Sequence, residues 1–147
     1  MLGESLPHVD YLLPSAEEAA MLTGEREPEK MAARLLGMGP KVVALKMGEK
    51  GCYVADREGA FSVPPYAVEA VDSTGAGDAF VAGFVTGVVK GLGLRGCAEM
   101  GNAVGALCVT RVGTTPGLPG LKAVGDLMQG RFRLDDGGAA EGGAGRR

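Results

Sequence analysis

The chain has 147 residues, a formal net charge of −3 at pH 7 and 46% hydrophobic residues, which fits one domain with a sizeable core. A pI of about 5.2 provides no basic field, so we expect no nucleic-acid partner. The longest strongly apolar run, 79–89, is shorter than the roughly 18 residues that a membrane span needs. We therefore expect no membrane partner, and the N-terminus lacks the features of a signal peptide.

The cysteines and glycines of the chain carry further information. Cys52, Cys97 and Cys108 form no C-x-x-C pair, which predicts reduced, buried thiols in a cytoplasmic protein. Glycine occurs 26 times, either because helices pack closely or because the backbone approaches a ligand. Five of these glycines lie in residues 135–147, which we expect to be a disordered tail.

The predicted elements follow an α/β order. In chain order we expect a short buried strand at 9–13, helices at 15–22 and 28–36, a buried strand at 41–46, a hairpin of strands at 52–56 and 60–64, a short strand at 68–71, and helices near 77–91, 95–110 and 119–128. This order predicts a sheet that is covered by helices on both faces. The helix near 77–91 is apolar nearly all round, which predicts that it is buried.

The most informative segment is VDSTGAGDAF at 71–80. Gly75, Ala76 and Gly77 leave their amides accessible at a predicted helix start, where the helix dipole favours an anion without any basic side chain. Asp78 stands in the first turn, where it could accept a proton from a hydroxyl that attacks phosphorus. The alternative is an ordinary helix start, with a cap from Asp72, Ser73, Thr74 or Asp78.

Other phosphate-binding motifs do not fit this sequence. The P-loop pattern needs a Gly-Lys dipeptide, and the chain has none. A G-x-G-x-x-G pattern occurs at Gly91, Gly93 and Gly96, but it follows a predicted helix and not a strand. We therefore do not interpret it as a dinucleotide fingerprint.

The segment DSTGAGDAF closely resembles the second signature of the ribokinase-like (PfkB) carbohydrate kinase family, D-T-x-G-A-G-D-x-F. LPSAEEAAMLTG resembles the family's P-N-x-x-E-x-x-x-L-T-G segment, and KMGEKGCYV resembles its T/K-x-G-x-x-G turn and hairpin. NAVGALCVTRVGTTPGLP resembles its last helix and the glycine-rich loop that follows. Together these segments cover roughly residues 9–128 and imply the C-terminal portion only of a three-layer αβα, Rossmann-like fold.

The resemblance implies an enzyme that phosphorylates a sugar hydroxyl with ATP and Mg²⁺, with 1–134 as its ATP-binding portion. Asp78 would be the general base, and Gly75, Ala76 and Gly77 the anion hole. The positions that match ATP contacts are Ser15 (usually asparagine in the family), Lys46, Gly48, Gly51 and Asn102. Glu18 matches a glutamate that organises Mg²⁺ through water. A K⁺ site found in many members matches Asp72, Thr74, Cys108, Arg111, Gly113 and Gly117.

Several of these positions have a simpler structural explanation. Ser15 and Glu18 have the spacing of a capping box. Gly48 and Gly51 could simply form the turn between two strands, and Asn102 could simply face solvent. Family members also carry a first half with sugar-binding strands. Without it we expect an open sheet edge and no substrate site, so one alternative is a truncated nucleotide-binding module or pseudoenzyme. Because the substrate residues of the family lie in that first half, the other alternative is a nucleoside or vitamin-precursor kinase of the same fold. The expected partners are a small-molecule sugar or nucleoside, and either an N-terminal half or a second copy in a homo-oligomer.

Overall fold

The computed structural model describes residues 5–110 and 120–130. The described helices are α2 (Ala16–Thr23), α3 (Pro28–Gly37), α4 (Ala76–Val89), α5 (Leu94–Val109) and α6 (Leu121–Met128), with short 3₁₀ helices η1 (Leu6–His8) and η2 (Gly48–Lys50). The strands are β1 (Tyr11–Leu12), β2 (Val42–Lys46), β3 (Cys52–Asp56) and β4 (Ala60–Val63). The expected tail at 135–147 and the predicted helix start at Pro119 lie outside the described residues.

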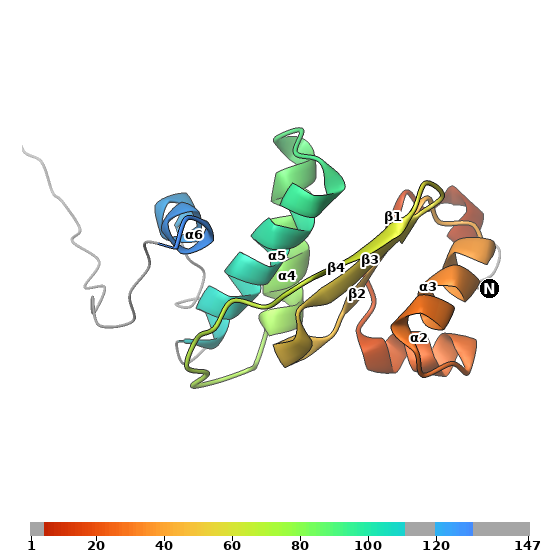
Figure 1. The fold of residues 1–147 in the computed structure, drawn as a ribbon, viewed down its shortest axis with the longest axis horizontal. Helices are drawn as coiled ribbons and strands as arrows, with labels where there is room; N and C mark the ends of the chain where they lie inside the picture. Colours follow the sequence, from red (N-terminus) through yellow and green to blue (C-terminus); the bar gives the residue numbers. More distant parts are fainter. Residues whose placement is uncertain (1–4, 111–119, 131–147) are drawn as a thin grey trace, which may run out of the picture.

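The strands form one sheet in the order β1-β2-β3-β4. β1 runs parallel to β2, whereas β2, β3 and β4 are antiparallel neighbours. Helices α2 and α3 lie on one side of the sheet, and α4 and α5 lie on the other (Figure 1). Alternate residues of β2 enter different cores: Val42 and Ala44 pack toward α4 and α5, and Val43 and Leu45 pack toward α2 and α3. This confirms the predicted sheet with helices on both faces.

Local signals set most element ends as expected. Ser15 caps α2, and Gly24 ends it in the left-handed conformation with φ 74°. Pro28 occupies the first turn of α3. All three cysteines are buried and free, as predicted.

Three predictions for the elements need correction. Residues 68–71 form no strand, because the amides of Val71 and Asp72 donate to the carbonyl of Val109 at the end of α5. β1 is shorter than expected and half exposed. Helix α4 is buried on only part of its surface: Val85 is 46% and Val89 81% exposed. The sheet and α5 cover its other sides, and no described element covers this flank.

Helices α4 and α5 approach each other through glycines. A Cβ on Gly83 would lie 2.7 Å from the carbonyl oxygen of Met100 and 2.9 Å from the Cα of Gly101. A Cβ on Gly87 would lie 2.8 Å from the Cα of Cys97. Because backbone atoms stand in the way, these positions admit no side chain without separating the helices. Close helix packing therefore explains these glycines.

We expect Gly83→Ala to lower the free energy of unfolding by about 1–3 kcal/mol, because the added methyl overpacks the α4–α5 contact. Gly125→Ala in α6 is the matched control. No described residue has an atom within 4 Å of a Cβ at Gly125, so the higher helix propensity of alanine should stabilise the variant by up to about 1 kcal/mol. Urea denaturation of both variants measures the difference, and equal effects would contradict the packing argument.

Candidate functional site

The predicted anion hole lies at the start of α4. Gly75 is the N-cap residue, with φ 80° and ψ 0°, a left-handed conformation that favours glycine. The amide of Ala79 closes the first helical turn on the carbonyl of Gly75 at 2.9 Å. The amides of the residues in between have no intrahelical acceptor, but that of Ala76 donates to the Ser73 carbonyl at 3.2 Å. The turn therefore uses one predicted anion-hole amide and leaves those of Gly77 and Asp78 directed out of the helix end.

Lys46, one of the expected ATP-contacting residues, stands at this helix end, although an anion hole of backbone amides does not require a basic side chain. Lys46 is the last residue of β2, and its Nζ lies 3.6 Å from the position that a Cβ on Gly77 would occupy. An ammonium group beside the positive end of a helix is electrostatically unfavourable unless an anion lies between them. The arrangement is therefore typical of a phosphate-binding site. Asp78 follows in the same turn with an exposed side chain.

Ser15 and Glu18 form the capping box that their spacing predicts. The amide of Ser15 donates to Glu18 Oε2 at 2.7 Å, and the amide of Glu18 donates to Ser15 Oγ at 3.1 Å. The backbone hydrogen bond from Ser15 lowers the pKa of Glu18, and the charge of Lys46 lowers it further. Ser15 also forms a parallel bridge to Lys46. The capping box accounts for both residues as a helix cap, and it also holds the Glu18 carboxylate where the charge of Lys46 acts on it.

Three residues of the expected K⁺ site lie together. The amide of Thr74 donates to Asp72 Oδ1 at 2.9 Å, and the Cys108 thiol donates to the Thr74 carbonyl at 3.9 Å. Burial raises the pKa of the Cys108 thiol, and the Asp72 carboxylate adds to this shift. Arg111, Gly113 and Gly117 lie outside the described residues, so the K⁺ site stays a prediction.

The two glycines of the predicted ATP-contacting turn have structural reasons to be there. Gly48 has φ 58° and Gly51 has φ 82°. A Cβ on Gly51 would meet the carbonyl oxygen of Val63 and the backbone of Pro65. The turn between β2 and β3 therefore requires Gly51 whether or not a nucleotide binds there.

Asn102 does not face solvent: it lies on the buried side of α5 and is only 8% exposed. Its Nδ2 donates to the carbonyls of Val63 at 3.2 Å and Pro64 at 3.0 Å, where the chain leaves β4. Burial raises the pKa of the neighbouring Cys52 thiol to about 12, although a hydrogen bond with Asn102 opposes the shift. The side chain thus ties the end of the hairpin to α5. Its expected place at an adenine pocket stays a prediction.

Neither of two other features appears in the described part of the chain. No helix between residues 5–110 or 120–130 is long and apolar enough to cross a membrane. In the same residues, no group of three or more histidine, cysteine, aspartate and glutamate side chains gathers as a metal site would require.

We expect Asn102→Ala to lower the free energy of unfolding by about 1–3 kcal/mol, because two buried carbonyls lose their donor. Asn102→Asp should be worse, since it replaces the donor by a carboxylate beside the same carbonyls. Urea denaturation without nucleotide measures both. If the asparagine served only a nucleotide, neither variant would change the midpoint.

Comparison with known proteins extends this picture. A family model described as pfkB family carbohydrate kinase matches residues 1–121. A protein of Archaeoglobus fulgidus named as an uncharacterized sugar kinase is 39% identical over 114 residues, which cover 78% of this chain and 45% of the relative. The ATP-dependent 6-phosphofructokinase of Thermoanaerobacterium thermosaccharolyticum is 37% identical over 116 residues, which cover 79% of this chain and 36% of the relative.

Solved structures agree with the family match. The ribokinase of Thermotoga maritima superposes with a TM-score of 0.82 at 31% identity, over 86% of this chain and 44% of its own. The ribokinase of Arabidopsis thaliana, solved with ribose and ATP, superposes with a TM-score of 0.80 at 31% identity, over 86% and 43%. This chain thus spans less than half the length of these relatives. It belongs to the pfkB family of carbohydrate kinases and has part of the ribokinase-like α/β fold.

Proposed function

We propose that residues 1–134 are the ATP-binding, base-bearing portion of an ATP-dependent carbohydrate kinase. The observation that carries this proposal is the start of α4, where Asp78 stands in the first turn and Lys46 Nζ lies 3.6 Å from the position of a Cβ on Gly77. Two similar structures support the choice of nucleotide. The Arabidopsis ribokinase was solved with ribose and ATP, and a ribokinase II of E. coli with ATP and Mg²⁺ is 34% identical to this chain.

The proposed reaction transfers the γ-phosphoryl group of ATP to a sugar hydroxyl. The hydroxyl gives its proton to the Asp78 carboxylate while its oxygen bonds to the γ-phosphorus. The bond from that phosphorus to the bridging oxygen breaks, and ADP leaves with the electron pair. The amides of Gly77 and Asp78, together with Lys46, face the charge that develops on the transferring group. Asp78 needs exposure to reach an acceptor, and its side chain is exposed.

Mg²⁺ fits this site only in company with the nucleotide. Glu18 is an exposed carboxylate on the Lys46 side of the site, and the described residues hold no cluster that would bind a cation alone. Mg²⁺ commonly keeps several waters and takes one or two carboxylates plus substrate phosphates. Glu18 would hold it through water, and the ion would supply neutralisation of phosphate charge.

A nucleoside is the second candidate acceptor. The cytidine kinase of Thermococcus kodakarensis is 38% identical over 105 residues, so this part of the fold is compatible with either acceptor. The proposed base and the proposed phosphate-facing groups would serve both reactions alike. A pure nucleotide-binding module would not need Asp78, since a carboxylate there repels phosphate.

We expect Lys46→Met to weaken binding of ATP·Mg²⁺ roughly tenfold or more, because a charge-assisted contact to phosphate is lost. Lys41→Met is the matched control. Lys41 precedes the opposite end of β2 and pairs with Asp10, so its loss should change affinity less than about twofold. Isothermal titration of this chain measures both, and equal effects would remove Lys46 from the site.

We expect Asp78→Asn to lower kcat by roughly 10²–10⁴-fold in any preparation that phosphorylates the acceptor, because the base is lost. ATP affinity should stay equal or rise, since the amides remain and one repulsive charge is gone. Asp10→Asn, which removes a surface carboxylate paired with Lys41, is the control. A rate for Asp78→Asn within about threefold of the unmutated protein would reduce Asp78 to a helix-terminal residue.

A further inference from the structure

A row of paired residues crosses the sheet at the end where the candidate site lies. Ser15 forms a bridge to Lys46 at the end of β2. Lys46 pairs with Cys52 on β3, and Cys52 pairs with Val63 on β4. We name this set the strand-end row and define it by Ser15, Lys46, Cys52 and Val63. Because each member pairs with the next, the position of Lys46 depends on how both ends of the row are fixed.

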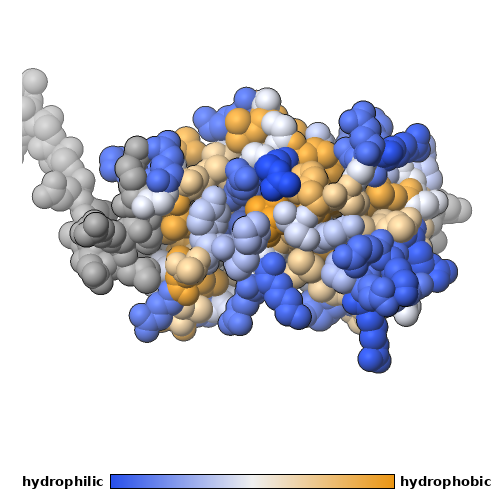
Figure 2. Space-filling view, in the orientation of Figure 1, coloured by the Kyte–Doolittle hydropathy of each residue, from blue (hydrophilic) through white to orange (hydrophobic). Residues whose placement is uncertain are grey.

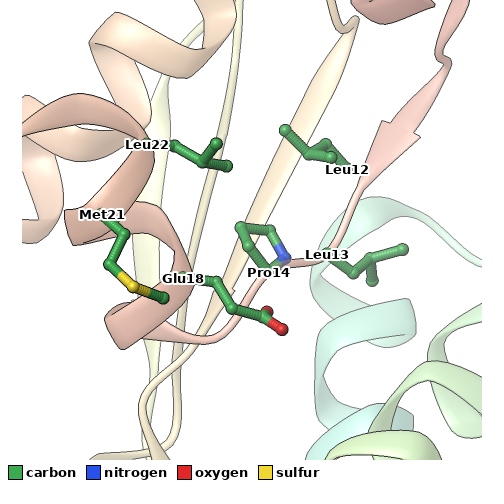
Figure 3. A pocket seen from close by; sticks show the side chains of 6 residues that line it. All are labelled: Leu12, Leu13, Pro14, Glu18, Met21 and Leu22. Carbon is green, nitrogen blue, oxygen red and sulfur yellow. The ribbon is translucent and has the colours of Figure 1, made fainter. Parts of the chain in front are cut away.

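One end of the strand-end row is fixed beside the capping box. Figure 3 shows Glu18 next to Pro14, where the chain passes from β1 to α2. The amide of Lys46 donates to the Pro14 carbonyl at 2.9 Å, and the amide of Ser15 donates to Glu18 Oε2 at 2.7 Å. Lys46 is therefore anchored on this side through its own backbone.

The other end of the strand-end row is fixed by Asn102 on α5. Its Nδ2 donates to the carbonyl of Val63 at 3.2 Å and to that of Pro64 at 3.0 Å, and the side chain is buried. The first of these bonds holds a member of the row itself. The two bonds match the two hydrogens of the amide nitrogen, so the nitrogen is committed to the protein.

The turn that follows Lys46 rests on the same segment of β4. A Cβ on Gly51 would meet the backbone of Val63 and Pro65, and the carbonyl of Gly51 accepts from the amide of Met47 at 2.9 Å. Met47 follows Lys46 directly. A shift of the backbone at 63–65 would therefore move this closely packed turn and the end of β2 with it.

Helix α5 also contacts the other half of the candidate site. Gly101, next to Asn102, faces α4, where a Cβ on Gly101 would lie 2.9 Å from the ring of Phe80. One turn further along, a Cβ on Gly105 would lie 3.4 Å from the carbonyl oxygen of Ala76 in the first turn of α4. This part of α5 thus contacts the strand end on one side and the start of α4 on the other.

We infer that Asn102 is a positioning residue for phosphate binding, because it holds Lys46 at the start of α4. The role of Lys46 rests on the proposed function, and the assignment of Asn102 goes beyond it. Lys46 Nζ lies 3.6 Å from the position of a Cβ on Gly77. An ammonium group that moves away from this position attracts an anion at the helix start less strongly, since the attraction falls with distance. Asn102 acts through Lys46 and does not read the base.

Inorganic tripolyphosphate separates this role from a contact with the base, because it has the three phosphates of ATP and no base. Isothermal titration in Mg²⁺ gives the affinity of this chain for each ligand, and the stoichiometry gives the fraction of folded protein. We expect Asn102→Ala to weaken both ligands alike, by at least about fivefold. Asn102→Ser keeps one hydroxyl donor, so it should lose less for both ligands and provides the measurement if the alanine variant unfolds.

A double-mutant cycle tests whether Asn102 acts through Lys46. In the Lys46→Met background the ammonium group that Asn102 would position is gone. We therefore expect Asn102→Ala to change the affinity for tripolyphosphate by less than about twofold in that background. A loss that had nothing to do with Lys46 would be the same in both backgrounds.

Thr23→Ala is the matched control for the loss of a buried hydrogen bond. Thr23 is 7% exposed, and its Oγ1 donates to the Ala19 carbonyl at 2.7 Å. Thr23 ends α2, at the opposite end from Ser15, in the part of the molecule where Figure 2 shows hydrophilic residues gathered over α2 and α3. We expect this variant to have a lower urea midpoint and an unchanged affinity for both ligands.

Three outcomes would overturn the inference. They are a loss of affinity for ATP alone, which would place Asn102 at the base, no loss beyond that of Thr23→Ala, and equal losses with and without Lys46. The single variant Lys46→Met tests the proposed function separately. If Lys46→Met weakens both ligands and Asn102→Ala does not, the inference fails while the proposed function stands. If Lys46→Met changes neither affinity, the phosphate site is contradicted and the inference falls with it.

Discussion

The close backbone contact between α4 and α5 is the constraint on which the site depends. At Gly83 and Gly87 the two helices lie so close that a single added methyl group would clash with the backbone of α5. That contact fixes the axis of α4, and the packing of Phe84 against the sheet side fixes its rotation. Only then does the first turn of α4 meet the end of β2, where Lys46 lies beside Gly77. A shift of α4 would separate the ammonium from the helix end, although neither residue takes part in the helix contact.

Most of this fold could be predicted because its signals are local. The Ser15–Glu18 capping box, Pro28 in a first turn and the apolar run of β2 each depend on residues close in sequence. The strand predicted at 68–71 failed because its amides bond to α5, a contact between segments far apart in the chain. The burial of α4 was overestimated for a related reason. The apolar residues of a helix show which of its surfaces could be buried. Which of them are buried depends on the elements that pack around the helix.

In the candidate site, too, the local features could be predicted and the contacts between distant segments could not. The motif at 72–80 predicted a helix start with small residues and an aspartate, and the structure has that start. Two details could not be read from it. The amide of Ala76 is used by a turn that closes on Ser73, and Lys46 joins the site from a strand distant in sequence. Asn102 shows the converse, because a polar residue among small ones was compatible with solvent, and only the end of β4 supplies its two acceptors.

The sequence left two explanations open for the high glycine content, close helix packing and approach of the backbone to a ligand. The structure relates different glycines to different explanations. Gly83, Gly87 and Gly101 face another helix at distances that exclude a Cβ. Among the residues that the structure describes, no backbone of another element lies within 4 Å of a Cβ on Gly77, and the neighbour found there is the Lys46 ammonium. Helix packing therefore cannot account for Gly77. A side chain there would occupy the space between an ammonium group and two amides, which is where an anion gains most from both. Open space for a Cβ is not special to Gly77, since Gly125 has it as well. At Gly77, however, that space is bordered by the Lys46 ammonium and the first-turn amides, which the phosphate-binding interpretation explains and the packing interpretation does not.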